Sequence, residues 1–194
     1  MLSLLCLAFT SLASAAGLSS TISVFAPGTQ VDGAVINAES SGFFTGLKAP
    51  GTYCPLDPSQ CPAVRGTLIV GLLGGMATEV PGGQQIYVQA DGQVKFVEPH
   101  SAYLPPGSLL EGWFRKTLKS NCAADVVVAD FLPLDGSSDG GVTLCPDVPP
   151  FLSSSGAQFS VYVKTKAFNL TGCIDAVGLV LTDTQFQYGA WEYT

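Results

Sequence analysis

Hydrophobic and polar residues alternate in short runs along most of the chain, and turn-forming residues separate these runs. The alternation is clearest where Phe159, Val161 and Val163 are interleaved with mostly polar residues, which is typical of a half-buried strand. No window shows the period and caps of an amphipathic helix. Strands are therefore expected at residues 22–25, 35–37, 43–47, 67–72, 112–117, 125–132, 141–145, 158–165, 176–182 and 189–193, and in a hairpin within 85–97.

The hairpin has a register that its own side chains define. A three-residue loop of Ala90, Asp91 and Gly92 places Val88 opposite Val94, so the apolar residues of both strands share one face and the other face is mostly polar. A two-residue loop would scatter the apolar residues over both faces. Three-residue loops commonly need positive φ at their third position, where Gly92 stands. The sequence thus predicts a bulged hairpin.

The pattern as a whole predicts a single all-β domain of about a dozen short strands, spanning residues 16–194. The 22 Gly and 13 Pro residues are spread along the chain as turn punctuation. With 47% hydrophobic and 12% charged residues, the chain is too apolar to be disordered. The strand number fits a β-trefoil, and it also fits a β-sandwich or jelly roll. Three segments each place a turn between two strand-like runs, and this weak threefold repeat favours the trefoil. The sandwich is the alternative.

The first residues predict export from the cell. An apolar run at residues 2–12 precedes the small residues Ala13, Ser14 and Ala15, as in a secretory signal peptide over residues 1–15. The run is too short to span a bilayer. The mature chain is expected outside the cell or in the cell wall, as a monomer without a membrane anchor. Its net charge of -7 argues against binding to nucleic acid or anionic lipid.

Five cysteines remain after cleavage, and an oxidising compartment favours their pairing. Cys54 and Cys61 stand in matching Cys-Pro steps and would close a short loop. Cys145 and Cys173 are then natural partners that join two strand ends. Cys122 is left free, and we expect it to be buried. Without a Cys-x-x-Cys pair and with one histidine, the chain predicts no metal centre and no cofactor.

No set of residues predicts a catalytic site. His100 is the only histidine, so a Ser-His or Cys-His mechanism would have to use it, but a surface or structural role is favoured. The Gly-x-Ser-x-Gly motif at residues 136–140 has the composition of a hairpin loop and lacks the following helix of a nucleophile elbow. Asp135 and Asp139 lack the spacing of a calcium loop. Paired acids for glycoside cleavage remain an alternative, although no spacing identifies a pair.

Two surface features bear on glycans. Asn169-Leu170-Thr171 is a glycosylation sequon, which in a secreted chain predicts an exposed, modified Asn169 just before Cys173. Tyrosines at positions 87, 103 and 162 can stack on sugar rings, although ordinary strand positions are the more common role of such residues.

Several segments together resemble the family of secreted fungal IgE-binding proteins. They are the run at residues 80–108 (VPGGQQIYVQADGQVKFVEPHSAYLPPGS), Thr52-Tyr53-Cys54-Pro55 with Cys61-Pro62, Leu144-Cys145-Pro146, Cys173, and the terminal Ala190-Trp191-Glu192-Tyr193-Thr194. That family is more distantly similar to fungal cell-wall proteins of the phialide-development type. The resemblance implies a secreted fungal protein, wall-associated or allergenic, with no catalytic residues to carry over. Cys122 and the Phe-Ser-Val-Tyr-Val run at residues 159–163 depart from the family pattern.

The sequence therefore predicts a non-catalytic extracellular or wall-associated fungal protein that IgE can bind. Weak binding to a glycan is the expected activity, with a cell-wall polysaccharide or a host protein as the partner. Two alternatives stay open. One is a carbohydrate-active hydrolase that uses paired Asp or Glu residues, and the other is a secreted effector that acts on a host.

Overall fold

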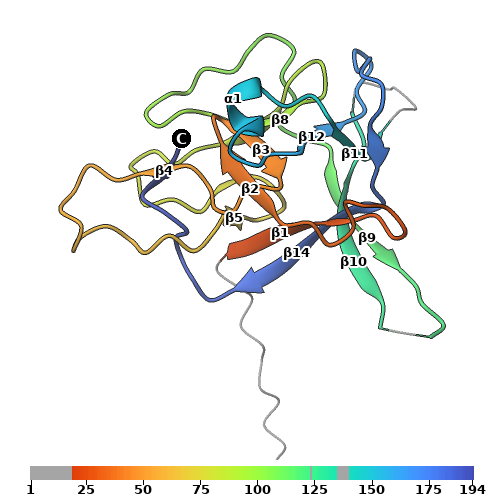
Figure 1. Cartoon of the computed structure of the whole chain (residues 1–194), viewed down its shortest axis with the longest axis horizontal. Helices are drawn as coiled ribbons and strands as arrows, with labels where there is room; N and C mark the ends of the chain where they lie inside the picture. Colours follow the sequence, from red (N-terminus) through yellow and green to blue (C-terminus); the bar gives the residue numbers. More distant parts are fainter. Residues whose placement is uncertain (1–18, 123, 135–139) are drawn as a thin grey trace, which may run out of the picture.

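The computed structural model describes residues 19–122, 124–134 and 140–194, and these residues form mostly β-strands and connecting loops (Figure 1). The first sheet contains β1 (Ser19–Phe25), β5 (Ile69–Val70), β6 (Gly75–Met76), β9 (Trp113–Leu118), β10 (Val126–Phe131) and β14 (Gly178–Thr184). Their spatial order is β6-β5-β1-β14-β10-β9. Strand β1 pairs with β14 over seven residues, so the first described strand lies beside a strand near the end of the chain.

The second sheet contains β2 (Ile36–Glu39), β3 (Gly42–Thr45), β7 (Ile86–Val88), β8 (Val94–Phe96), β11 (Val142–Cys145), β12 (Phe159–Val163) and β13 (Ile174–Asp175). Its order is β13-β11-β12-β3-β8-β7, and β2 also pairs with β3. A small third sheet pairs β4 (Thr52–Tyr53) with β15 (Glu192–Tyr193). One short helix, α1 (Pro150–Ser153), precedes β12.

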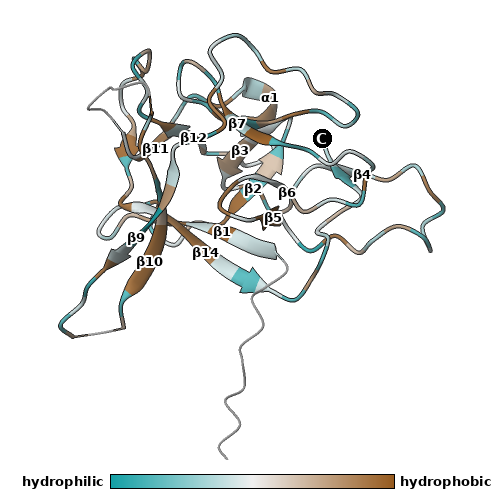
Figure 2. Cartoon of the chain, turned by 180° about the vertical axis from the view of Figure 1, so that it is seen from behind, coloured by the Kyte–Doolittle hydropathy of each residue, from teal (hydrophilic) through white to brown (hydrophobic). Residues whose placement is uncertain are grey.

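The two large sheets contribute side chains to one continuous hydrophobic core. Ile22 and Val24 enter it from β1, at alternate positions of the strand, as the period of a strand requires. From the second sheet, Phe43 and Phe96 pack edge to face with ring centroids 5.5 Å apart. Figure 2 shows the hydrophobic stretches concentrated in strands such as β3 and β10.

The all-β prediction is confirmed, and the architecture is the sandwich that the sequence offered as the alternative to the trefoil. Among the described strands, no pairing closes either sheet into a barrel. The weak threefold repeat was misleading because it considered only strands that are adjacent in the sequence. The sheets are instead assembled from distant segments, as in the pairing of β1 with β14.

The predicted bulged hairpin is also confirmed. Val88 faces Val94 across β7 and β8, and the Gln89 amide donates to the Gln93 carbonyl at 2.9 Å. Gly92 closes the loop with a φ of 95°. A side chain at position 92 would also collide with the Val163 carbonyl, so the neighbouring strand β12 requires glycine there as much as the turn does.

Four elements were not predicted from the sequence, because they are too short to show a hydrophobic period. Strands β4, β6 and β13 have two residues each, and α1 is a single turn that starts at Pro150. Proline is favoured at the first position of a helix, because the missing amide would have no helical partner there. The predicted signal peptide, Asp135 and residues 136–139 of the Gly-x-Ser-x-Gly motif lie outside the described residues.

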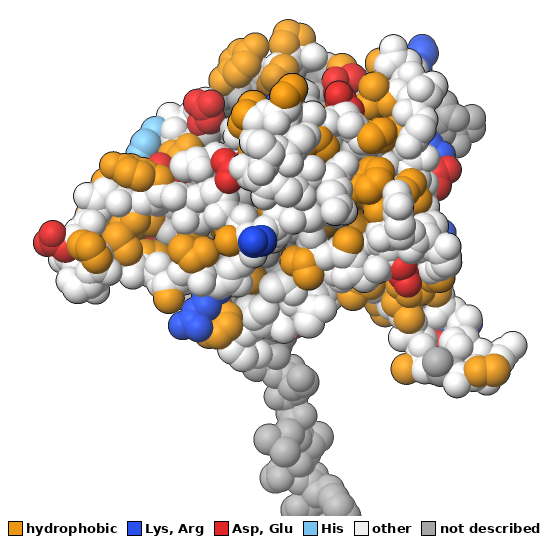
Figure 3. All heavy atoms as spheres, viewed as in Figure 1, with side chains coloured by type: hydrophobic (Ala, Val, Ile, Leu, Met, Phe, Trp, Pro, Cys, Tyr) orange, Lys and Arg blue, Asp and Glu red, His pale blue; other side chains and the backbone are white. Residues whose placement is uncertain are grey.

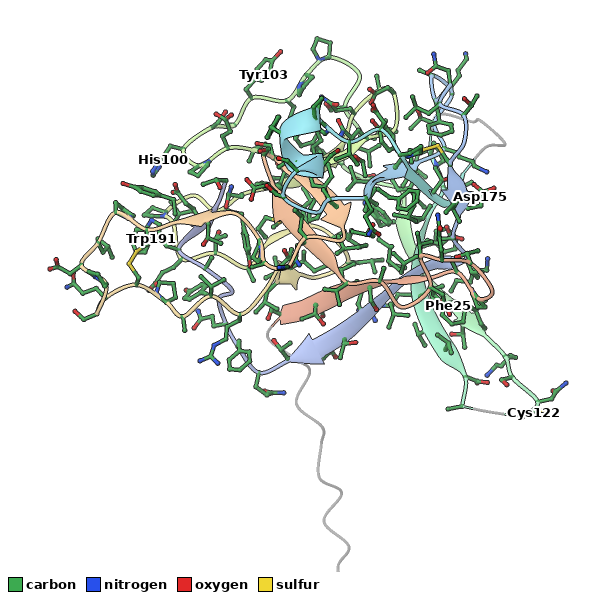
Figure 4. All side chains as sticks on the ribbon, viewed as in Figure 1. Phe25, His100, Tyr103, Cys122, Asp175 and Trp191 are labelled. Atoms are coloured by element: carbon green, nitrogen blue, oxygen red, sulfur yellow. A yellow bond between two sulfur atoms is a disulfide. The ribbon has the colours of Figure 1, made fainter. Side chains whose placement is uncertain are left out.

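The structure joins Cys54 to Cys61 and Cys145 to Cys173, the pairing that the spacing suggested. Cys122 is free, but it is exposed, so the prediction of a buried thiol is wrong. The reason is the length of the ribbon formed by β9 and β10. This ribbon continues past the sandwich and carries its connecting turn, with Cys122, into solvent (Figure 4).

Candidate functional site

A pocket of about 760 Å³ opens beside the last four residues of the chain. Four separate segments form it: residues 40–41, residues 53 and 55, residues 98–100, and residues 191–194. We call this pocket the terminal groove. Its volume lies within the range of about 300–1,000 Å³ that is typical of ligand sites. Figure 4 places His100 and Trp191 together on this side of the molecule.

Pairing of β15 with β4 brings the end of the chain to the groove. Glu192 lies opposite Tyr53, and the Thr194 amide donates to the Gly51 carbonyl at 3.1 Å. Tyr193 is fully buried, while the Tyr53 side chain is 56% exposed. Because neighbouring residues of a strand point to opposite faces, burial of Tyr193 directs Glu192 and its cross-strand partner Tyr53 outward.

Gln84 fixes the backbone of Tyr193 inside the protein. Its side-chain amide donates to the Tyr193 carbonyl at 2.8 Å and to the Val97 carbonyl at 3.1 Å, and its side-chain oxygen accepts from the Tyr193 amide at 2.8 Å. Gln84 is itself buried, with 3% of its surface exposed. These bonds leave the end of the chain little freedom, because buried polar groups that lose their partners are costly.

The Tyr193 phenol is anchored at its other end. It donates to the Gly66 carbonyl at 2.8 Å and accepts from the Leu68 amide at 2.9 Å. Burial raises the pKa of this phenol to about 12. The backbone carbonyl of Trp191 is also held, because it accepts from the Val80 amide at 2.9 Å. The base of the groove is therefore a bonded and buried part of the fold.

Unusual backbone conformations gather at the groove. Four described residues other than glycine have positive φ, and three of them line it: Ser40 at 49°, Ser41 at 57° and His100 at 60°. Each such conformation costs on the order of 1 kcal/mol and tends to occur at functional sites. Ser40 and Ser41 form the turn between β2 and β3, where a tight hairpin requires positive φ at both central residues.

The groove combines aromatic faces with carboxylates and hydroxyls. Tyr53 and Trp191 supply the rings, and Glu98 and Glu192 supply the carboxylates. No Lys or Arg belongs to the part of its lining that the structure describes. Figure 3 shows the protein's only histidine beside a cluster of hydrophobic side chains. Such a surface suits a ligand that has both apolar faces and many hydroxyl groups.

The tyrosines considered as sugar platforms have different surroundings. Tyr103 is 70% exposed. Tyr87 is buried, although it lies on the hairpin face that was predicted to be mostly polar. Tyr162 is buried and its hydroxyl donates to the Asp147 carboxylate at 2.6 Å, so it is a core residue; burial is the main reason that its pKa is raised. Asn169 is exposed, and its glycosylation stays a prediction.

Sequence reasoning missed the central members of the groove. Tyr53, Trp191 and Glu192 entered only as parts of segments that resemble a family, and nothing local indicated that they meet. The one sequence feature that could have indicated the groove is the Trp-Glu-Tyr run at residues 191–193, which combines two aromatic residues with an acidic one. His100, the single candidate base, does lie in the groove, and its side chain is exposed.

Within residues 19–122, 124–134 and 140–194, no three His, Cys, Asp or Glu side chains are placed to hold a metal ion. Over the same part of the chain, no helix has the length and apolar character needed to cross a membrane.

The fold, the two disulfides and the open groove define a disulfide-bonded β-sandwich of the extracellular kind. The chain is 31% identical over 175 residues to a protein of the fungus Arthroderma benhamiae that is named an uncharacterized secreted protein. The match covers 87% of this chain and 82% of that relative. The chain therefore belongs to a family of secreted fungal proteins. No family model and no solved structure matches it.

Proposed function

We propose that this secreted protein is a non-catalytic binder of cell-wall polysaccharide and that the terminal groove is its glycan site. The observation that carries the proposal is the meeting of Tyr53 and Trp191 with two carboxylates in one open pocket. Pyranose rings have apolar faces that stack on aromatic side chains, and hydroxyl edges that donate to carboxylates. Both kinds of contact are available in this groove.

The preformed shape of the groove supports the same proposal. The anchors of Tyr193 and the carbonyl of Trp191 hold one wall in place before any ligand arrives. A ligand then does not have to order that wall, and the entropic cost of binding is reduced. Binding by IgE, which the family resemblance implies, would be an antigenic property of the exposed surface and stays a separate prediction.

The alternative of a carbohydrate-active hydrolase has one observation in its favour. Glu98 and Glu192 line the same pocket, and glycoside hydrolases use two carboxyl groups that flank the bond to be cleaved. If the protein were such an enzyme, it would release new reducing ends from a polysaccharide. Replacement of Glu192 by Gln would then abolish the release.

Retention on insoluble polysaccharides tests the proposal. The purified protein is incubated with chitin, β-glucan and mannan, and the bound fraction is measured against protein concentration. Tyr53→Ala removes an exposed ring and is expected to weaken retention about tenfold, which corresponds to about 1.4 kcal/mol. Phe151→Ala is the matched control, because Phe151 is 61% exposed and lies on α1 outside the groove.

The results separate the proposals. Retention that Tyr53→Ala weakens and Phe151→Ala leaves unchanged supports binding at the groove. Absence of retention on all three polysaccharides, or equal retention of both variants, contradicts it. Release of reducing ends that depends on Glu192 would replace the binding proposal with the hydrolase. Thermal unfolding of each variant shows whether it is folded.

A further inference from the structure

A second, smaller pocket adjoins the terminal groove. It has a volume of about 230 Å³ and is lined by residues 41, 87, 95–98, 101, 103 and 105. We call it the side pocket. Ser41 and Glu98 belong to the linings of both pockets and therefore stand between them. The Glu98 side chain is exposed, so a ligand in either pocket can reach it.

The wall between the pockets is held by backbone hydrogen bonds. The Phe96 amide donates to the Ser41 carbonyl at 3.1 Å, which ties the turn between β2 and β3 to strand β8. On the other side, the Ser101 amide donates to the Glu98 carbonyl at 3.1 Å. The Tyr103 amide donates to the Ser101 hydroxyl at 3.2 Å. The loop that carries both His100 and Tyr103 thus has a defined path (Figure 4).

The side pocket has its own aromatic platform. Both tyrosines line it, and Tyr103 is 70% exposed while Tyr87 is 7% exposed. Tyr87, Tyr103 and Glu98 all belong to the lining of this pocket. Burial raises the pKa of the Tyr87 phenol, and the charges of Tyr103 and Glu98 raise it further. The side pocket therefore combines tyrosine with a carboxylate as the terminal groove does, and the carboxylate of Glu98 is shared by the two pockets.

Size decides between two separate sites and one extended site. A pocket of about 230 Å³ is below the range of about 300–1,000 Å³ typical of independent ligand sites. It is better suited to hold one end of a ligand whose other end occupies the terminal groove. A polysaccharide chain has this property, because each sugar along it presents a similar apolar face.

We propose that the terminal groove and the side pocket are two subsites of one site, which binds an oligosaccharide chain lying across Ser41 and Glu98. Tyr103 is the stacking residue of the second subsite. This inference rests on the proposed glycan binding and adds the class of ligand to it: a linear chain of several sugars in place of a single sugar or a chain end.

Affinity measured against chain length tests the two subsites. Soluble oligosaccharides of chitin, β-glucan and mannan, from disaccharide to hexasaccharide, are titrated into the protein by calorimetry. For the polysaccharide that is retained, the hexasaccharide is expected to bind at least about tenfold more tightly than the disaccharide. Tyr103→Ala should remove this gain and leave the disaccharide affinity within about twofold of the wild type. Tyr53→Ala should weaken every length, and Phe151→Ala should weaken none.

The outcomes distinguish the two subsites from the proposed glycan binding on which they rest. Equal affinity for all lengths overturns the two subsites while glycan binding stands. A Tyr103→Ala variant that gains from length as the wild type does, or that loses affinity equally at every length, also overturns them. If neither the polymers nor the oligosaccharides bind, the proposed function fails, and the subsites fail with it.

Discussion

Two small β-structures at opposite sides of the molecule differ in how the protein holds them. The pairing of β4 with β15 involves only two residues on each strand, yet it contains Tyr193, which is fully buried. The ribbon of β9 and β10 is paired over six residues, but most of β9 is exposed and its turn carries the exposed Cys122 (Figure 4). We therefore expect burial, more than the number of paired residues, to hold a peripheral strand in place.

The polar contacts of the two regions differ in the same way. Gln84 and Tyr193 form bonds that are buried and satisfied on both sides. The ribbon instead carries the ion pairs of Lys119 with Asp125, at 2.6 Å, and of Lys116 with Asp130, at 3.5 Å. Both lysine side chains are well exposed, so solvent and salt weaken these pairs. We therefore expect substitutions near the groove to affect stability far more than substitutions on the ribbon.

Gln84→Ala should produce the largest effect. It removes the partners of the Tyr193 amide and carbonyl and of the Val97 carbonyl, each of which costs about 1–3 kcal/mol when it is left buried without a bond. We expect the free energy of unfolding to fall by about 3 kcal/mol or more, as measured by urea denaturation.

Gln85→Ala is the matched control for this substitution, because Gln85 is the exposed neighbour in the same segment. It should change the free energy of unfolding by less than about 0.5 kcal/mol. Equal effects of the two substitutions would show that the buried bonds of Gln84 do not hold residues 191–194 in place.

Alkaline pH should produce the next largest effect. Burial raises the pKa of Tyr193 from 10.0 to about 12 in the folded protein, so the folded state keeps its proton at a pH where the unfolded state has lost it. The contribution to stability is complete below pH 10 and is lost as the pH rises to about 12. A shift of this size corresponds to about 2–3 kcal/mol.

Urea denaturation at several pH values between 8 and 12 measures this loss. Tyr162 and Tyr87 also have raised pKa values and add to the slope in the same direction. Tyr193→Phe should therefore make the slope shallower without abolishing it, although it lowers stability at neutral pH by removing the bonds to Gly66 and Leu68. An unchanged slope in Tyr193→Phe would count against the buried phenol as its source.

The sequence predicted those features of the fold that depend on residues within one short segment. The register of the hairpin between β7 and β8 followed from apolar residues within one short segment, and the structure has that register. The choice between trefoil and sandwich did not follow, because it depends on pairings such as β1 with β14. Local alternation shows which face of a strand is buried, but it does not show which strand lies beside it.

The candidate site could be predicted even less, for the same physical reason. The terminal groove is built from four segments that are far apart in the chain, and each of them alone looks like a loop or a strand end. Only His100 was singled out beforehand as a candidate for chemistry. Tyr53 and Trp191 line the same pocket because β15 pairs with β4 and Tyr193 is buried, which is a tertiary effect.

Cys122→Ser should produce the smallest effect and tests the ribbon directly. The thiol is free and exposed, so the substitution leaves no cavity and breaks no disulfide. We expect the free energy of unfolding to change by less than about 0.5 kcal/mol. In the wild-type protein, brief treatment with iodoacetamide under native conditions should label the peptide that contains Cys122, as read by mass spectrometry. The peptides with the four bonded cysteines should stay unlabelled. Slow labelling, or a loss of stability comparable to that of Gln84→Ala, would mean that the ribbon is held as firmly as the groove and that exposure does not separate the two regions.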